Sequence, residues 1–204
     1  MKIQQLEVFT GRKVLLCFAL VLSSGLASCS TTTRHSIESR QWGAATNGLQ
    51  LSLTVLTTGK RDDPEFEITL RNMGEQDVSL NLGRMLANGK VQLPSKIHLQ
   101  IVDGSGKNRE LDFSDKRYGA IGGRMDDYVV PLRTGSTYTL KLRLDQFWSP
   151  NTGEFELKLK PGHYEISAQF QGDSAETSNP DMAGMKLMHF WKGNLQSNPV
   201  LIVE

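Results

Sequence analysis

Large aliphatic side chains alternate with polar ones along much of the chain, and this period of two residues constrains the fold more than any other feature. In the stretch 49–55, Leu or Val occupies every second position. Successive side chains of a strand point to opposite faces, so the pattern is typical of a strand with one buried and one wet face. The same pattern predicts strands at 49–55, 65–71, 78–82, 97–101, 109–113, 138–144, 155–159, 164–170 and 200–203.

The spacing of these segments predicts the fold class. Turn residues such as Gly, Asn and Asp separate the strands, and no long amphipathic helical pattern accompanies them. Short strands at close spacing are typical of an antiparallel β-sandwich or barrel. We therefore expect one all-β domain over 42–204, a β-sandwich of about eight or nine strands. Three longer stretches, 83–95, 116–127 and 172–193, are expected to be irregular, and long loops often carry function.

The first 28 residues have the three parts of a secretory signal peptide. The head is basic, the run 14–22 is uncharged and rich in Leu and Val, and small residues follow at 23–28. A transmembrane helix is the alternative, but it needs about 20 predominantly apolar residues. Only 14–22 is strongly apolar, so the sequence predicts that residues 1–28 are removed.

The end of this segment, Leu26-Ala27-Ser28-Cys29, resembles the lipobox of bacterial lipoproteins. The resemblance implies that the Cys29 thiol receives a diacylglyceryl group and that cleavage makes Cys29 the acylated N-terminus. Only a thiolate is a good nucleophile for such a thioether near neutral pH. The alternative is an ordinary signal peptide that leaves Cys29 as a free thiol. Ser30 differs from the Asp that retains many such lipoproteins in the inner membrane, so the resemblance favours the periplasmic face of a Gram-negative outer membrane.

Residues 29–41 would then form the lipidated Cys and a flexible tether. The stretch 30–41 is polar and has Ile37 as its one large aliphatic residue, so it is not expected to fold. A coil of this length spans roughly 20 Å. Cys17 leaves with the signal peptide, so the mature chain has one cysteine and no intrachain disulfide.

The net charge of the mature chain limits which classes of partner it is expected to bind. Loss of residues 1–28 changes the formal net charge from +1 to about −1, with both signs spread along the chain. Nucleic acid is therefore not an expected partner, because phosphate binding requires a clustered basic face. The same argument excludes polybasic attachment, which leaves the lipid on Cys29 as the expected membrane anchor.

One local motif narrows the fold. The segment Leu159-Lys160-Pro161-Gly162-His163-Tyr164 resembles the corner before strand F of immunoglobulin-like domains, where a Tyr hydroxyl bonds back to the backbone. The turn Arg71-Asn72-Met73-Gly74 resembles the B–C connection of such sandwiches. The chain thus resembles bacterial lipoproteins with one immunoglobulin-like domain. The resemblance implies a fold and carries no activity with it.

No catalytic constellation is found in the sequence. The four histidines are scattered, and none lies at metal-ligand spacing from a second His or Cys. No standard nucleophile, phosphate-binding or zinc-protease motif is present. We therefore expect no catalytic residues and no cofactor apart from the lipid.

Two weaker binding hypotheses remain. Met182, Met185 and Met188, with His189 adjacent, would gather thioethers that suit Cu(I), although Met also fills gaps under loops. Trp148 and Trp191 would stack on sugar rings if they are exposed, whereas Trp is mostly buried on average.

The sequence therefore predicts a non-enzymatic, membrane-anchored module of the cell envelope. Its expected partner is another envelope protein, recognised through loops or an exposed sheet edge. Binding of a glycan or of copper is the alternative, and an enzyme with an unfamiliar site is a third.

Overall fold

The computed structural model describes residues 40–56, 64–114, 124–155, 158–175 and 188–203. The signal peptide, Cys29 and the tether up to residue 39 lie outside the described residues, so these assignments stay predictions. Among the described residues there is no α-helix, and no helix is long and apolar enough to cross a membrane.

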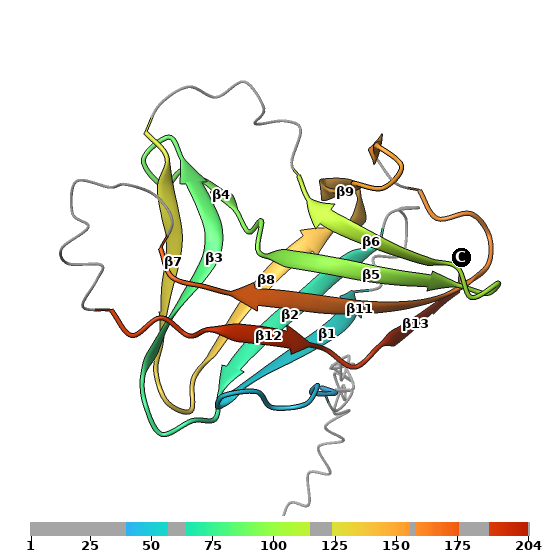
Figure 1. The fold of residues 1–204 in the computed structure, drawn as a ribbon. Coiled ribbons are helices and arrows are strands. Elements are labelled where there is room, and N and C mark those ends of the chain that lie inside the picture. The colour runs from blue at the N-terminus through green and yellow to red at the C-terminus, as the bar shows by residue number, and fades with distance from the viewer. Residues whose placement is uncertain (1–39, 57–63, 115–123, 156–157, 176–187, 204) are drawn as a thin grey trace, which may run out of the picture. The chain divides into compact units, whose positions relative to one another are not determined.

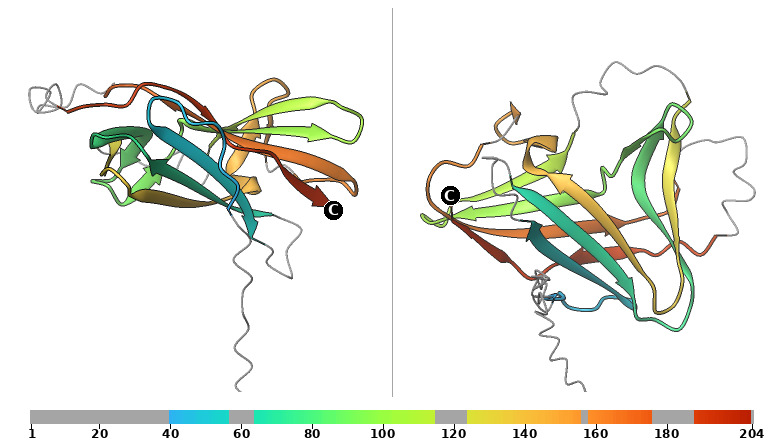
Figure 2. Two further views of the ribbon diagram at one scale, coloured as in Figure 1. Left: turned by 90° about the horizontal axis from the view of Figure 1, so that it is seen from below. Right: turned by 180° about the vertical axis from the view of Figure 1, so that it is seen from behind.

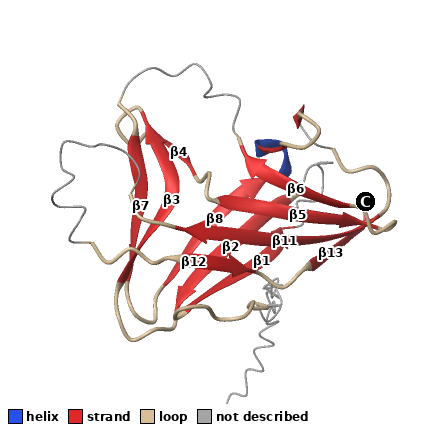
Figure 3. Ribbon diagram, viewed as in Figure 1, coloured by secondary structure: helices blue, strands red, loops and turns tan. Residues whose placement is uncertain are grey.

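The described residues form thirteen strands and one short 3₁₀ turn, η2 (Leu144–Gln146) (Figures 1 and 3). The strands are β1 Leu49–Leu56, β2 Glu65–Asn72, β3 Val78–Leu86, β4 Val91–Leu93, β5 Ile97–Asp103, β6 Asn108–Phe113, β7 Asp126–Leu132, β8 Thr137–Arg143, β9 Phe147–Ser149, β10 Glu154–Phe155, β11 His163–Gly172, β12 Gly193–Gln196 and β13 Val200–Val203.

These strands make three antiparallel sheets. Sheet A has the order β1-β2-β8, and sheet B has the order β4-β3-β7. Sheet C has the order β10-β9-β6-β5-β11-β12, and β13 pairs with β11 beside β12. Figure 2 gives two further views of this arrangement. The expected all-β antiparallel sandwich is confirmed.

One core joins sheets A and C. The alternating aliphatic residues of β1, β2 and β8 pack in the same buried cluster as those of β5, β6 and β11. In β1, Leu49, Leu51 and Leu53 are almost fully buried, as the period of two predicts. Because burial of one such side chain contributes about 1.5–3 kcal/mol, the alternation is enough to fix which face of each strand points inward.

The tyrosine corner predicted from the sequence is present. The Tyr164 hydroxyl donates a hydrogen bond of 2.9 Å to the Lys160 backbone oxygen, and the ring is buried at the start of β11. β11 lies between β5 and the β12–β13 edge, as strand F lies between C and G in an immunoglobulin-like sheet.

The predicted turn at 71–74 is also present, and it carries the chain from sheet A to sheet B. The buried Asn72 amide donates to the backbone oxygens of Gln76 and Leu132, at 2.9 and 3.0 Å. Its side-chain oxygen accepts the Gly74 N–H at 2.9 Å. One side chain therefore binds three backbone groups and joins the turn after β2 to the end of β7.

Four strands were not predicted, and one was predicted to be longer than it is. β4, β9 and β12 have only three or four residues, which is too short for alternation to be visible. β7 begins inside a stretch expected to be irregular, and its pairing with β3 is interrupted by a register shift between Asn81 and Arg84. The strand expected at 155–159 is shorter, because β10 has two residues and 158–160 are not in a strand.

Candidate functional site

The candidate site begins with the turn between β5 and β6. The Asp103 carboxylate accepts hydrogen bonds from the Ser105 N–H at 2.9 Å and the Ser105 hydroxyl at 2.5 Å, and from the Lys107 N–H at 3.1 Å. These bonds, led by that from the Ser105 hydroxyl, lower the pKa of Asp103. Gly106 has φ of 81°, the left-handed conformation that closes three-residue hairpin loops. The turn thereby fixes the register of the two strands.

That register brings a histidine and two carboxylates together. His98 on β5 lies directly opposite Asp112 on β6, and Glu110 is two residues away on the same face. His98 Nδ1 is 2.8 Å from Asp112 Oδ1. One possible ligand atom from each of the three residues lies within 4.8 Å of the others. We call this group the His98 cluster.

Sequence reasoning missed this cluster. The expectation concerned only the spacing of each histidine from a second His or Cys, and it left out carboxylates, which are the neighbours of His98 on the next strand. The signal that was available is the tight turn at 103–107. In a hairpin, residues at equal distances along the sequence from the turn lie opposite each other. Counting from the turn at 103–107 along both strands therefore predicts that His98 lies opposite Asp112.

The cluster lies within one polar row across sheet C. Directly opposed residues of antiparallel strands point to the same face. The registers therefore align Phe155, Trp148, Asp112, His98, Gln169 and Gln196. The alternate residues of the same strands, such as Leu99, Leu111 and Ala168, face the core. We call this outward side of sheet C the polar face.

A hollow of about 420 Å³ opens on the polar face beside the cluster. Its polar lining consists of His98, Glu110, Gln169, Gln171, Asn194 and Gln196. Gln169 and Gln196 each direct an amide nitrogen toward Gln100 Oε1, at 3.5 and 3.4 Å. Amide groups both donate and accept hydrogen bonds, so the hollow suits a polar ligand.

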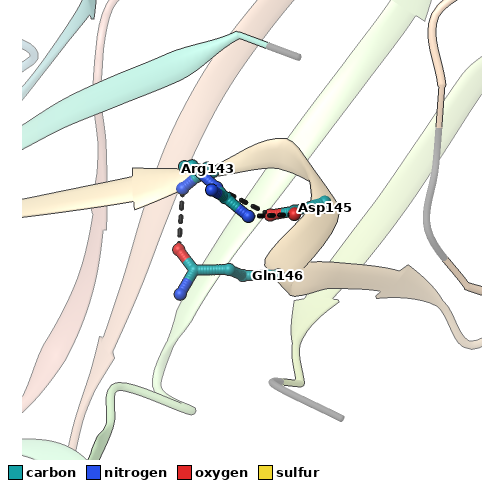
Figure 4. Close-up of polar contacts among 3 residues, drawn as sticks. All are labelled: Arg143, Asp145 and Gln146. Atoms are coloured by element: carbon teal, nitrogen blue, oxygen red, sulfur yellow. Dashed lines mark hydrogen bonds and ion pairs between the residues drawn. The ribbon is translucent and has the colours of Figure 1, made fainter. Parts of the chain in front are cut away.

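Trp148, one of the two aromatic candidates, lies near one end of this row, between Phe155 and Asp112. The turn η2 leads the chain from β8 of sheet A into β9 of sheet C (Figure 4). There the Arg143 N–H donates to Gln146 Oε1 at 2.8 Å, and the Arg143 guanidinium pairs with Asp145. Trp148 is half-buried and stacks on Phe155, with ring centroids 5.1 Å apart and planes 13° apart. Phe155 is 40% exposed.

Trp191, the other aromatic candidate, is buried. Its side chain is 3% exposed, stacks on Phe170 and donates its indole N–H to the Asn47 backbone oxygen at 3.1 Å. No ring face is left for a sugar, so the hypothesis that Trp191 is a stacking platform is wrong, and its role is to fill the core.

The copper hypothesis is largely untested by the structure. Met182 and Met185 lie outside the described residues. Met188 is 44% exposed, and the exposed His189 accepts the Ser79 N–H on its backbone oxygen at 2.8 Å. A copper site at Met182, Met185, Met188 and His189 therefore stays a prediction.

The C-terminal strand presents a second candidate surface. β13 pairs with β11, and among the described residues it has no other strand partner. Its side chains alternate, with Ile202 buried and its two neighbours outward. Leu201 is 77% and Val203 is 71% exposed, which makes them the most exposed large apolar side chains that the structure describes.

Comparison with known proteins adds little to these observations. No protein-family model matches the chain, and no curated protein matches it. A solved structure similar to the chain is the X-ray structure of Northeast Structural Genomics Consortium target SoR45, with 17% identity and a TM-score of 0.38. The match covers 78% of this chain and 89% of that one. A likeness at this level carries no conclusion about function.

Proposed function

We propose that the protein is a lipid-anchored, extracytoplasmic lipoprotein whose sandwich is a non-catalytic binding module for another protein of the cell envelope. The lipobox-like segment Leu26–Cys29 supports the anchor. The observation that carries the binding role is the pair of outward aliphatic side chains, Leu201 and Val203, on the edge strand β13.

An edge strand of this kind is suited to strand addition. Its outer backbone groups are available to an extended segment, and alternate side chains provide apolar contacts. Natural edge strands are commonly protected by charged residues, and β13 has none between Val200 and Val203. The proposed occupant is therefore an extended, apolar segment of an envelope protein.

The anchor and the binding surface are tested separately. Cys29→Ser removes the lipid acceptor and should move the protein from the membrane fraction to the soluble fraction while the sandwich keeps its circular dichroism spectrum. A Cys29→Ser protein that still sediments with membranes contradicts the anchor, whatever the result for β13.

The surface is tested by site-specific photocrosslinking in the intact envelope. A photoreactive residue at Leu201 should give one discrete adduct, and the same residue at the exposed Lys141 on β8 is the matched control. Val203→Glu should abolish the Leu201 adduct, because a carboxylate would be desolvated in the apolar contact. Equal adducts from both positions, or an adduct insensitive to Val203→Glu, would refute β13 as the surface.

A glycan ligand is the second candidate, and the polar row favours it. The Trp148–Phe155 stack lies next to Asp112, and the amide-lined hollow continues the same face. Aromatic rings beside carboxylate and amide groups are a suitable combination for a sugar with one apolar and several polar faces. Isothermal calorimetry with soluble peptidoglycan fragments should show saturable binding to the wild type and none to the double variant Trp148→Ala with Phe155→Ala. Unchanged binding in this double variant would exclude the site.

A further inference from the structure

The His98 cluster has the composition of a metal site. We propose that His98, Glu110 and Asp112 bind a divalent transition-metal ion, with Zn²⁺ as the reference ion, on the polar face of sheet C. The inference does not depend on the anchor or on the β13 surface.

The geometry of the three side chains supports a shared ion. Two ligands about 2.1 Å from one zinc at the tetrahedral angle lie about 3.4 Å apart. His98 Nδ1 and Asp112 Oδ1 are 2.8 Å apart, so the two atoms need to move apart by only about half an ångström to hold an ion between them. The three ligand atoms already lie within 4.8 Å of each other, inside the reach of small rotamer changes.

The strands hold these ligands in place. Two ligands come from alternate positions of β6, and the third comes from the directly opposed position of β5. The Asp103 turn fixes this register, so ligand spacing is set by the sheet and not by a loop. Ligands on paired strands need little ordering when an ion binds, which favours affinity.

The charge of the cluster also favours a cation. Glu110 and Asp112 are two residues apart on the same face, and their carboxylates repel each other. Within the described part of the chain, no ion pair is recorded for Glu110. The hydrogen bond between His98 and Asp112 joins two of the three groups, and Glu110 is the exposed third group beside them. One ion would join all three and would offset the repulsion between the two carboxylates.

The surroundings leave a coordination position open. One imidazole and two carboxylates give three protein ligands, the number found when a fourth position is kept for water or another ligand. The amide-lined hollow begins at His98 and Glu110, on the same face. A ligand with an oxygen donor would therefore coordinate the ion while it forms hydrogen bonds to Gln169 and Gln196.

Zinc titration of the full chain, purified in detergent without a histidine tag, tests the site. Isothermal calorimetry with Zn²⁺ alone should show one equivalent bound. Glu110→Gln, His98→Gln and Asp112→Asn should each lower the affinity at least about tenfold, because even groups that only support ligands cost 10–100-fold when removed.

Glu165→Gln is the matched control. Glu165 is an exposed carboxylate on the same face of sheet C, in β11, where it is paired with Val102 and Leu201. This variant should bind zinc as the wild type does. In amide NMR spectra, shifts caused by zinc should be largest in β5 and β6, and thermal melts without metal should show that the variants are folded.

The outcomes are decisive in both directions. Loss of binding in the three cluster variants, with retention in Glu165→Gln, supports the site. The proposal is overturned if Glu110→Gln binds zinc with wild-type affinity, since the ion would then be held elsewhere, for example at His189. Absence of saturable binding by the wild type would overturn it equally.

Discussion

The Trp191 indole packs closely against Gly172 and Gly193, and the distances predict how much a side chain at position 172 would lower the free energy of unfolding. Gly172 of β11 and Gly193 of β12 are directly paired. A methyl group at position 172 would lie 2.2 and 2.5 Å from Cε3 and Cζ3 of the indole, and 2.9 Å from the Trp191 backbone oxygen. We therefore expect Gly172→Ala to force the buried indole out of its position.

The expected change in the free energy of unfolding is the sum of two contributions. Overpacking of a well-packed core costs about 1–3 kcal/mol, and contacts this short place Gly172→Ala near the upper value. The φ of Gly172 is not in the positive region, so alanine itself would stabilise by about 0.4–1 kcal/mol through the unfolded chain. The net loss in the free energy of unfolding is then about 2 kcal/mol.

A double-mutant cycle separates the clash from other effects. Trp191→Ala alone should cost about 3–5 kcal/mol. In that background the contacts with the ring disappear and the one with the backbone oxygen remains, so Gly172→Ala should cost less than about 0.5 kcal/mol. The expected coupling of about 1.5–2 kcal/mol is measurable by urea denaturation. If Gly172→Ala costs the same in both backgrounds, the indole is not what excludes a side chain at 172.

Three further predictions concern single groups. Burial, and then the hydrogen bond to Tyr138, raises the pKa of Tyr128 above its ordinary value. Because the unfolded chain loses this proton near pH 10 while the native one keeps it, the free energy of unfolding should fall above pH 10 by up to about 1.4 kcal/mol per pH unit. Denaturation curves at pH 9 and 11 should show a smaller fall in Tyr128→Phe, and an equal fall contradicts the assignment. Tyr164→Phe should lower the free energy of unfolding by about 1 kcal/mol, since the Lys160 oxygen loses its donor, and urea denaturation at neutral pH checks this. Asn72→Ala should cost more, about 2–3 kcal/mol by the same measurement, because three backbone groups lose their partner at once.

The sequence predicts those parts of the fold that depend on local pattern. Alternation located β1, β2, β5, β6, β8 and β11 because each is long enough for several side chains to reach one core. The corner at Tyr164 and the turn at Asn72 were predicted because particular residues must stand at fixed offsets from a turn.

Alternation within a strand does not indicate which strand pairs with which, and only the tight turn between β5 and β6 indicates a register in the sequence itself. The short strands β4, β9 and β12 exist because a longer neighbour supplies their hydrogen bonds, and a segment of three residues has no period of its own. The site followed the same rule. His98 and Asp112 meet only through register, and whether Trp148 or Trp191 is exposed depends on which strand each adjoins.

The first residues that the structure describes are hydrogen-bonded to β1 and to the segment between β12 and β13. The Gly43 N–H donates to the Leu51 oxygen, and the Asn198 amide donates to the Trp42 oxygen at 3.0 Å. The Arg71 guanidinium lies 4.0 Å from the centre of the Trp42 ring. A pull applied to the chain ahead of residue 40 is therefore transmitted at once to β1, to β2 and to the segment between β12 and β13. The sandwich should resist mechanical extension from its N-terminus as a unit, and force spectroscopy should show one rupture event with no earlier peeling of β1.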